Sequence, residues 1–233
     1  MCHRPWKRKF FAIKQLFHQI RLPKQIVAEL ICCYTVDIEK LYRIFITCGV
    51  KPIEKIKQKV GRWKLKRNLK NRERNKTFHN FNTAQTVGII FDATDHQNYE
   101  VARNFGKFLN ERKIRIYGLG FADSKEVMNF YSYYTGFNFF TIKDSNWQGI
   151  PNNHNVKDFI NKEIDILIDL HRGENFQLEY ISAMSKAEFK IGPFTTKPNY
   201  YDFMIDISTN PTSDFLCEQI KHYLSIINND KSK

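Results

Sequence analysis

Cysteine is scarce in this chain, and most of it lies at one end. Of the five cysteines in 233 residues, four lie in the first fifty residues and only Cys217 lies further on. No evenly spaced disulfide framework can hold the main part of such a chain together, which is typical of a reducing cytoplasm. The pair Cys32-Cys33 is adjacent and no second pair faces it, so neither a zinc site nor a thioredoxin-like motif is expected.

Long apolar runs are also missing. The most apolar stretch, residues 26–36, contains Glu29 and is far shorter than the ~20 residues that a membrane-spanning helix needs. The first nine residues are basic, like the front of a signal peptide, but Lys14, His18 and Arg21 interrupt the apolar segment that would have to follow. The sequence therefore predicts a cytoplasmic protein with neither a secretion signal nor a transmembrane anchor.

The motifs of common nucleotide cofactors and hydrolases are absent as well. No GxGxxG follows the first expected strand, where the turn reads Asp92-Ala93-Thr94-Asp95, and no GxxxxGK[ST] occurs anywhere. That turn lacks a DxD spacing, and the chain contains neither a GxSxG elbow nor an HExxH pair. We expect no cofactor and no metal ion.

The chain does have enough apolar mass for a core, since 42% of its residues are hydrophobic. Its charge is divided unevenly. Residues 1–84 carry 21 basic and 5 acidic side chains, whereas residues 85–233 carry 16 basic and 19 acidic ones. The formal net charge of +13 therefore comes from the first third of the chain. This division predicts one folded domain of ordinary size behind a basic arm.

Residues 51–76 form the most basic part of that arm. They contain twelve Lys or Arg and two Glu, and apolar residues such as Ile53, Ile56 and Val60 recur every three or four positions. This spacing predicts a basic amphipathic helix. Ten net positive charges repel one another unless a polyanion neutralises them, and nucleic acid does so by releasing counterions. RNA suits the helix because it offers phosphates together with unpaired bases for a lone aromatic residue.

We therefore predict that this helix contacts RNA, with the ribosome or its precursors as a candidate partner. Two alternatives stay open: the helix docks on the weakly acidic surface of the domain or serves solubility, or it lies on an anionic membrane surface. The predicted phosphate contacts, with one tryptophan that stacks or packs, are Lys55, Lys59, Arg62, Trp63, Lys66, Arg67, Lys70, Arg72 and Arg74.

The segments around this helix are less regular. Residues 1–50 differ from the rest in cysteine content and texture, and we treat them as an N-terminal extension whose place in the native protein is open. A non-Met start near Val50 is one hypothesis for them. Residues 77–85 are rich in Asn and Thr and are interpreted as a linker. Residues 86–228 then form the main domain and residues 229–233 a tail.

The main domain alternates strand-like and helix-like segments. Short apolar runs predict strands at residues 86–91, 114–121, 137–142, 165–170, 189–192 and 202–207, and helical periods predict helices at 99–112, 127–134, 156–162, 176–186 and 212–228. Asp123 is the expected cap of the second of these helices, and Asn210-Pro211 that of the last. Strands separated by helices need crossover connections. The pattern thus predicts an α/β fold, Rossmann-like or flavodoxin-like, with a mostly parallel sheet and helices on both faces.

In such sheets ligands bind beyond the carboxyl ends of the strands. Carboxylates placed there could form a metal site or an acid/base pair, although Asp95, Asp123 and Ser124 precede helices, where capping is the simpler explanation. Asp169 and His171 are less easily explained as caps. The candidate catalytic residues are Asp92, Asp123, Asp169 and His171. In the loop at residues 143–151, Trp147 either faces a partner or packs back onto the domain's own core.

Four segments, TVGIIFDAT, DSNWQGIP, DILIDL and YISAMSKAEFKIG, together resemble an uncharacterised bacterial family. It is a domain of unknown function seen in Bacteroidota, in which a basic N-terminal helix precedes a small α/β domain. The resemblance covers residues 50–228, implies a cytoplasmic bacterial protein, and brings no activity with it. Residues 165–192 are also similar to the N-terminal half of heptosyltransferase-type glycosyltransferases. The half that holds the sugar-nucleotide site in that class has no counterpart here, which implies a binding remnant over an active transferase.

Together these observations predict a non-enzymatic binding module whose basic helix contacts RNA. The alternative is a small-ligand enzyme, or a degenerate sugar- or nucleotide-binding domain, that uses the carboxyl edge of the sheet. The sequence leaves the oligomeric state open.

Overall fold

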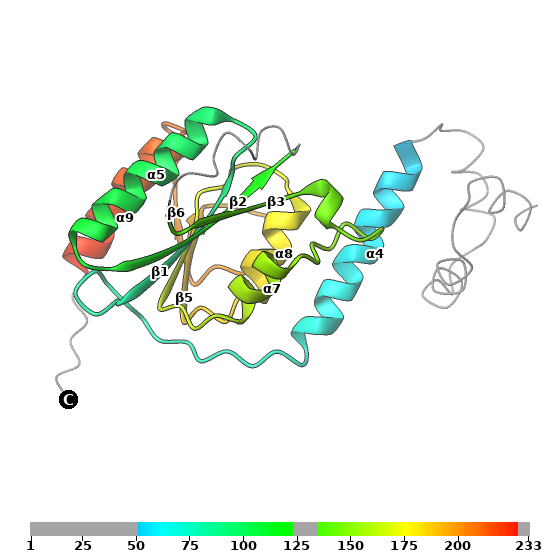
Figure 1. The fold of residues 1–233 in the computed structure, drawn as a ribbon, viewed down its shortest axis with the longest axis horizontal. Coiled ribbons are helices and arrows are strands. Elements are labelled where there is room, and N and C mark those ends of the chain that lie inside the picture. Colours follow the sequence, from blue (N-terminus) through cyan, green and yellow to red (C-terminus); the bar gives the residue numbers. More distant parts are fainter. Residues whose placement is uncertain (1–50, 124–134, 228–233) are drawn as a thin grey trace, which may run out of the picture. The chain divides into compact units, whose positions relative to one another are not determined.

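The computed structural model describes residues 51–123 and 135–227, with side chains from residue 57 onward. Within these residues a sheet of six parallel strands runs in the order β3-β2-β1-β4-β5-β6 (Figure 1). This confirms the predicted fold class, and the order is that of Rossmann folds, not that of flavodoxin. The strands are β1 (Thr86–Asp92), β2 (Arg115–Ala122), β3 (Phe137–Thr141), β4 (Ile166–Asp169), β5 (Phe189–Pro193) and β6 (Phe203–Ile205).

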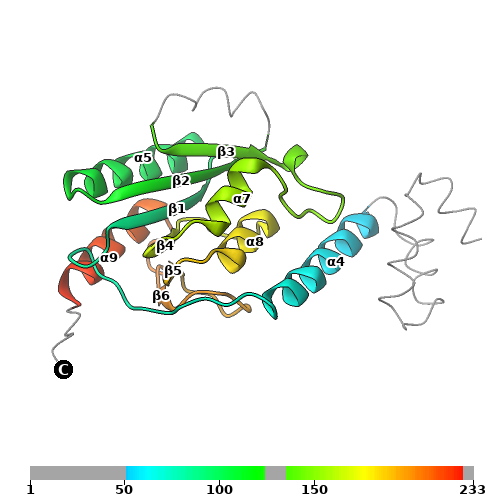
Figure 2. The ribbon, with the colours of Figure 1, turned by 60° about the horizontal axis from the view of Figure 1, so that its bottom comes forward.

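Helices cover both faces of the sheet. On one face α5 (His96–Glu111) lies beside α9 (Ser213–Ile226), and on the other lie α7 (His154–Asn161), α8 (Phe176–Met184) and α4 (Lys51–Leu69), as Figures 1 and 2 show. A short 3-10 helix, Ile142–Asp144, follows β3. Successive strand residues point to opposite faces, so Ile89 and Ile90 enter different core clusters and both are fully buried.

The predicted elements need correction mainly at their ends. The first helix of the domain begins at His96, where Asp95 caps it by accepting a hydrogen bond from the Gln97 N–H. The last helix is capped by Thr212, which accepts from the Phe215 N–H, so the expectation of a cap at Asn210-Pro211 was wrong. Thr212 directly precedes the helix, so its side-chain oxygen can accept from the third helical residue. Asn210 lies two residues too early to do this, and Pro211 has no side-chain acceptor. The helix expected at 127–134, residues 1–50 and the tail at 229–233 lie outside the described residues.

The basic helix is shorter than predicted, because α4 ends at Leu69 and not at residue 76. Past that point the arginines find acceptors on the domain. Arg72 donates to the backbone carbonyl of Ile160, and Arg74 forms an ion pair with Asp202. These contacts hold residues 72–76 in a non-helical path along the domain.

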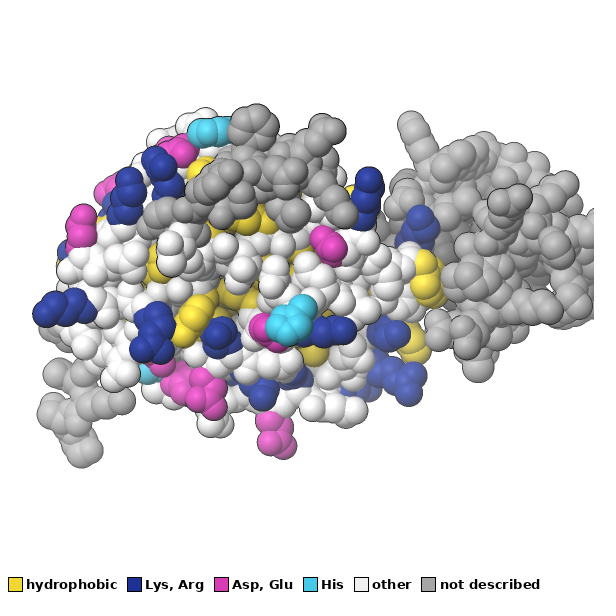
Figure 3. Space-filling model, viewed as in Figure 1, with side chains coloured by type: hydrophobic (Ala, Val, Ile, Leu, Met, Phe, Trp, Pro, Cys, Tyr) yellow, Lys and Arg dark blue, Asp and Glu magenta, His cyan; other side chains and the backbone are white. Residues whose placement is uncertain are grey.

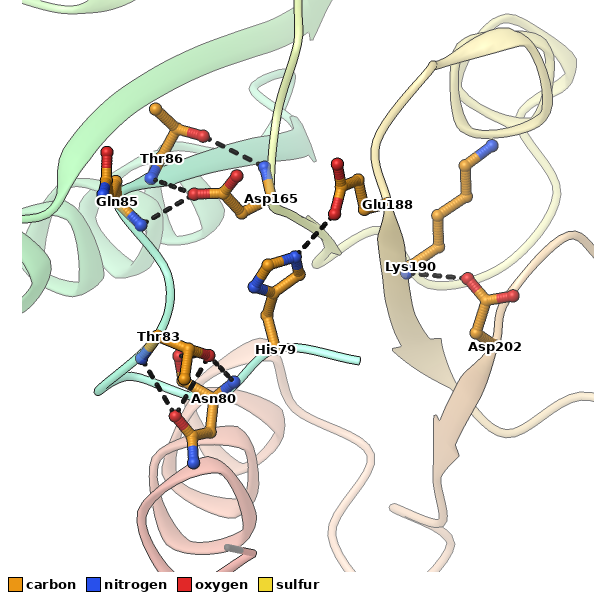
Figure 4. A network of polar contacts seen from close by, with 9 residues as sticks. All are labelled: His79, Asn80, Thr83, Gln85, Thr86, Asp165, Glu188, Lys190 and Asp202. Carbon is orange, nitrogen blue, oxygen red and sulfur yellow. Dashed lines mark hydrogen bonds and ion pairs between the residues drawn. The ribbon is translucent and has the colours of Figure 1, made fainter. Parts of the chain in front are cut away.

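The expected linker, residues 77–85, is in fact packed into the domain (Figure 4). The Thr77 N–H donates to the Glu188 carbonyl, and the His79 ring lies 2.7 Å from the Glu188 carboxylate. The Asn80 side chain donates to the carbonyl of Ile227. Near the start of β1, the carboxylate of Asp165 accepts from the backbone N–H groups of Gln85 and Thr86. The asparagines that suggested a linker serve turns and contacts instead.

Candidate functional site

Helix α4 docks on the domain through one face. Val60 is buried. Leu65 is 0% exposed and packs with residues of α7 and α8. Between them, Gly61 allows a close approach: a Cβ atom there would lie 2.5 Å from the Gln148 carbonyl oxygen and 2.8 Å from the Phe176 ring. The domain therefore meets the backbone of α4 directly.

The surface that receives α4 includes the loop at residues 143–151. The Asn146 carboxamide accepts hydrogen bonds from the N–H groups of Gln148 and Ile150, and the Asn146 N–H donates to the Ile150 carbonyl. Gln148 is buried, and Trp147 is half-buried. The loop is thus held by its own hydrogen bonds and gives α4 a fixed surface.

Three of the predicted phosphate contacts bind groups of the domain. The Arg62 guanidinium lies 3.2 Å from the Glu179 carboxylate and 5.9 Å from the centre of the Phe176 ring. Arg72 and Arg74 make the contacts with Ile160 and Asp202 described above. Burial alone would raise the pKa of Asp202, but hydrogen bonds from Arg74 and from the Lys190 N–H hold it below its usual value. These contacts hold this face of the arm against the domain.

Another side of α4 carries a row of exposed cations. Five exposed side chains follow one another at spacings of four, three, one and three residues. Four lie on the helix and the last is the residue directly after its end, and this spacing places them on one side. We call this set the α4 stripe; dark blue side chains gather over α4 in Figure 3. Among the described residues, no ion pair involves any of its four cations. The members of the stripe are Lys59, Trp63, Lys66, Arg67 and Lys70.

The stripe also contains the most exposed tryptophan of the described part. Trp63 is 45% exposed. The Arg67 guanidinium lies over its ring, 5.7 Å from the centroid. The side chain of Lys55, another predicted contact, is outside the described side chains. The sequence placed these residues on one helix but did not separate the face that docks from the face that stays exposed.

The second candidate site lies at the carboxyl edge of the sheet. Ile90 and Asp169 are register partners on β1 and β4, so Asp92 and His171 follow two residues later at the ends of neighbouring strands. Asp92 is half-buried and accepts a hydrogen bond from the Thr94 N–H. Asp123 is exposed, just past the end of β2. The strand ends meet as predicted, but the described residues contain no group of three potential metal ligands.

Asp169 is fully buried and both of its carboxylate oxygens have partners. The Tyr201 hydroxyl donates to one oxygen at 2.8 Å, and the His171 N–H donates to the other at 3.0 Å. Burial raises the pKa of Asp169, and the nearby His171 and the two hydrogen bonds offset this in part. Burial and the neighbouring Asp169 also raise the pKa of Tyr201. The carboxylate thus anchors the connection between β5 and β6.

His171 differs from Asp169 because its ring lacks hydrogen bonds. Its Nδ1 atom lies 3.8 Å from an Asp169 oxygen, which is beyond hydrogen-bond distance. Both ring nitrogens are buried and have no hydrogen-bond partner among the described residues. They are enclosed by the protein, so a substrate cannot reach them in this conformation.

Sequence reasoning missed Lys190, the only buried lysine of the described residues. Its ammonium group donates to the carbonyls of Ser182 and Ala183 at the end of α8, at 2.7 and 3.1 Å. Burial, followed by the charge of Arg74, lowers its pKa to about 7. The signal was present, since Lys190 interrupts a short apolar strand, FKIG. It donates hydrogen bonds to carbonyls at a helix end and lies in the interior, so it is a structural group.

Comparison with known proteins gives a family for this chain. The model of a family described as "Family of unknown function (DUF6913)" matches residues 57–227. No curated protein and no solved structure matches the chain. The expected resemblance to an uncharacterised domain is confirmed; a link to Bacteroidota or to heptosyltransferases does not come from these comparisons. Within the described residues, no helix is long and apolar enough to span a bilayer.

Proposed function

The chain belongs to the DUF6913 family, whose function is unknown, and from its surfaces we propose that it is a binding module for RNA, held against the α4 stripe. The single observation that carries the proposal is the division of α4 into two faces. Arg62 on one face is paired with Glu179 of the domain, whereas the four cations of the stripe are exposed together. Unpaired cations in a row are the electrostatic footprint of a protein that follows phosphates.

The same division argues against a membrane surface. An interfacial helix inserts its apolar face into the boundary between headgroups and acyl chains. Leu65 of α4 is already buried against the domain and Val60 is buried as well, so Trp63 is the one large apolar side chain that is exposed in the described part of the helix. Phosphates of a nucleic acid need no apolar face, and RNA therefore suits the stripe better than an anionic bilayer. A cytoplasmic location and a target on the ribosome belong to this proposal.

The alternative, a small-ligand enzyme at Asp92, Asp123, Asp169 and His171, has less support. Both oxygens of Asp169 are occupied by protein donors, and the His171 ring nitrogens are enclosed. Asp123 lies on the far side of β1 from Asp169, since β1 separates β2 from β4 in the sheet. No pair of these side chains is arranged for proton transfer to a bound ligand.

The proposal is tested by removing the four charges of the stripe together. In the full chain, the variant Lys59→Gln, Lys66→Gln, Arg67→Gln, Lys70→Gln is compared with Lys107→Gln, Lys143→Gln, Lys157→Gln, Lys186→Gln, which removes four exposed lysines elsewhere. Binding to a labelled 20-nucleotide RNA is measured by fluorescence anisotropy at several salt concentrations. The wild type and the control should show a slope of log affinity against log salt of about −3, from four contacts at about 0.7 each. The stripe variant should lose most of this slope and of the affinity.

Three outcomes contradict the proposal. One is binding that does not depend on salt, and another is an equal loss in the control. The third is co-sedimentation with vesicles rich in anionic lipid while the RNA stays unbound, which points to the membrane alternative. For the cellular partner, affinity purification from native cells with and without RNase separates an RNA partner from a protein partner. Ribosomal RNA should be recovered only without RNase.

A further inference from the structure

Trp63 lies among the cations of the α4 stripe, not at its margin. Lys59 precedes it by about one helical turn, and Lys66 and Arg67 follow it by about one turn. The docking face of the helix does not use the indole, because Gly61 and Leu65 meet the domain on the other side. A large apolar ring thus faces solvent between positive charges, which is the combination found on stacking platforms for nucleic-acid bases.

The docked state of α4 limits the forms of RNA that can reach this ring. One side of the helix is covered by the domain, whose Gln148 and Phe176 approach the backbone at Gly61. Only the exposed side of the helix can face RNA, and the major groove of double-stranded RNA is too deep and narrow for side chains to reach its bases. A duplex can therefore touch the lysines through its phosphates but leaves Trp63 without a base.

We propose that the α4 stripe selects single-stranded RNA, with Trp63 stacking on an unpaired base while the flanking cations hold neighbouring phosphates. This inference rests on the proposed RNA-binding function and adds the form of RNA that is bound. Arg67 contributes twice, because its guanidinium lies against the indole and its charge remains available to a phosphate.

The test compares one RNA sequence in two forms. Anisotropy is measured with an unstructured 20-nucleotide RNA and with its duplex at about 150 mM salt, using the full chain as wild type, Trp63→Ala and Trp63→Phe. The wild type should bind the single strand at least about tenfold more tightly than the duplex. Trp63→Ala should lose about tenfold for the single strand and little for the duplex. Trp63→Phe should recover part of the loss, and the salt slope should not change in either variant, since no charge is removed.

The outcomes separate this inference from the function on which it rests. If the wild type binds neither form, the proposed function itself fails. If it binds both forms equally, or if Trp63→Ala weakens both to the same extent, RNA binding stands and the stacking role is refuted. Lys59→Gln serves as the matched control on the same helix and should lower both affinities and the slope. Unchanged melting temperatures of the Trp63 variants show that they fold.

Discussion

Between about pH 7 and its ordinary pKa of 10.5, Lys190 is charged in the unfolded chain and largely neutral in the fold. Its side chain is 2% exposed, and its nearest partners are two backbone carbonyls at the end of α8. A neutral amine still carries N–H groups that can donate to these carbonyls. Lys190 therefore keeps its hydrogen bonds when it loses its proton, and the burial penalty falls on the charged form alone.

The stability of the protein should depend on pH through this residue. Its pKa is about 7 in the fold against an ordinary value of 10.5, so between these values the unfolded chain binds the extra proton and the folded one does not. The free energy of unfolding should then rise with pH in this window, by up to about 1.4 kcal/mol per pH unit. Urea unfolding at pH 7, 8 and 9 checks this by comparing wild type with Lys190→Met, which should lack the rise. Lys186→Met, an exposed neighbour, should keep it, and parallel curves for Lys190→Met and wild type contradict the assignment.

Asp169 makes a complementary case, a buried carboxylate explained by structure alone. The ring of Tyr201 lies against Gly192, where an added Cβ would approach it to 2.5 Å, and its hydroxyl reaches Asp169. This hydrogen bond links the connection between β5 and β6 to Asp169 at the end of β4. It explains Asp169 without any catalytic role.

Removing the hydroxyl should therefore cost stability. Tyr201→Phe keeps the ring but leaves one buried Asp169 oxygen without its donor, and an unsatisfied buried polar group costs about 1–3 kcal/mol. We expect a loss in that range in urea unfolding, with RNA affinity unchanged. The matched control is Tyr223→Phe, whose ring packs against Phe203. A control loss as large as that of Tyr201→Phe, or unchanged stability in Tyr201→Phe, contradicts the anchoring role.

At the scale of elements, α4 is defined by how closely it approaches the domain. Glycine in a helix interior is about 1 kcal/mol less favourable than alanine, so Gly61 weakens α4 as an isolated helix. Its place is explained by the close approach of Gln148 and Phe176. Gly61 therefore lowers the intrinsic stability of the helix but allows it to contact the loop at 143–151 and α8.

Whether Gly61→Ala raises or lowers the stability of the protein distinguishes a free α4 from a docked one. If α4 were free, Gly61→Ala would stabilise it; because α4 is docked, the new methyl group meets a backbone oxygen and should destabilise the protein by about 1–3 kcal/mol. Hydrogen exchange of residues 57–69 should become faster in Gly61→Ala. Gln58→Ala, on an exposed position of the same helix, should have little effect. Slower exchange in Gly61→Ala contradicts the docked arrangement.

At the scale of the whole molecule, the fold was largely predictable and the site only in part. Fully buried parallel strands such as β1 appear in the sequence as continuous apolar runs, and segments of helical periodicity lie between them. The fold class and most helices and strands could therefore be predicted from the sequence. The end of α4 at Leu69 did not, because the acceptors for Arg72 and Arg74 come from Ile160 and Asp202, far along the chain. Residues 77–85 were predicted to be a linker from their composition for the same reason, since the groups that they contact also lie far along the chain.

The division of the basic helix into two faces was equally hidden from the sequence. Lysines and arginines occur all around α4, and only the position of Glu179 on α8 decides that Arg62 is paired. Gly61, which reveals the docked side, carries no charge or apolar surface that a periodicity would count. The candidate carboxylates were placed at the correct edge because strand ends fix them, but Tyr201, which explains Asp169, comes from another segment.

The docking of α4 also sets an order of events during synthesis. Glu179 lies 117 residues after Arg62, and Asp202 lies 128 residues after Arg74. A chain made from its N-terminus exposes the helix, with Val60 and Leu65 uncovered, long before α8 and β6 exist. Contacts over such separations form slowly compared with local ones. The residues of the α4 stripe are therefore translated long before the contacts that hold α4 on the domain can form.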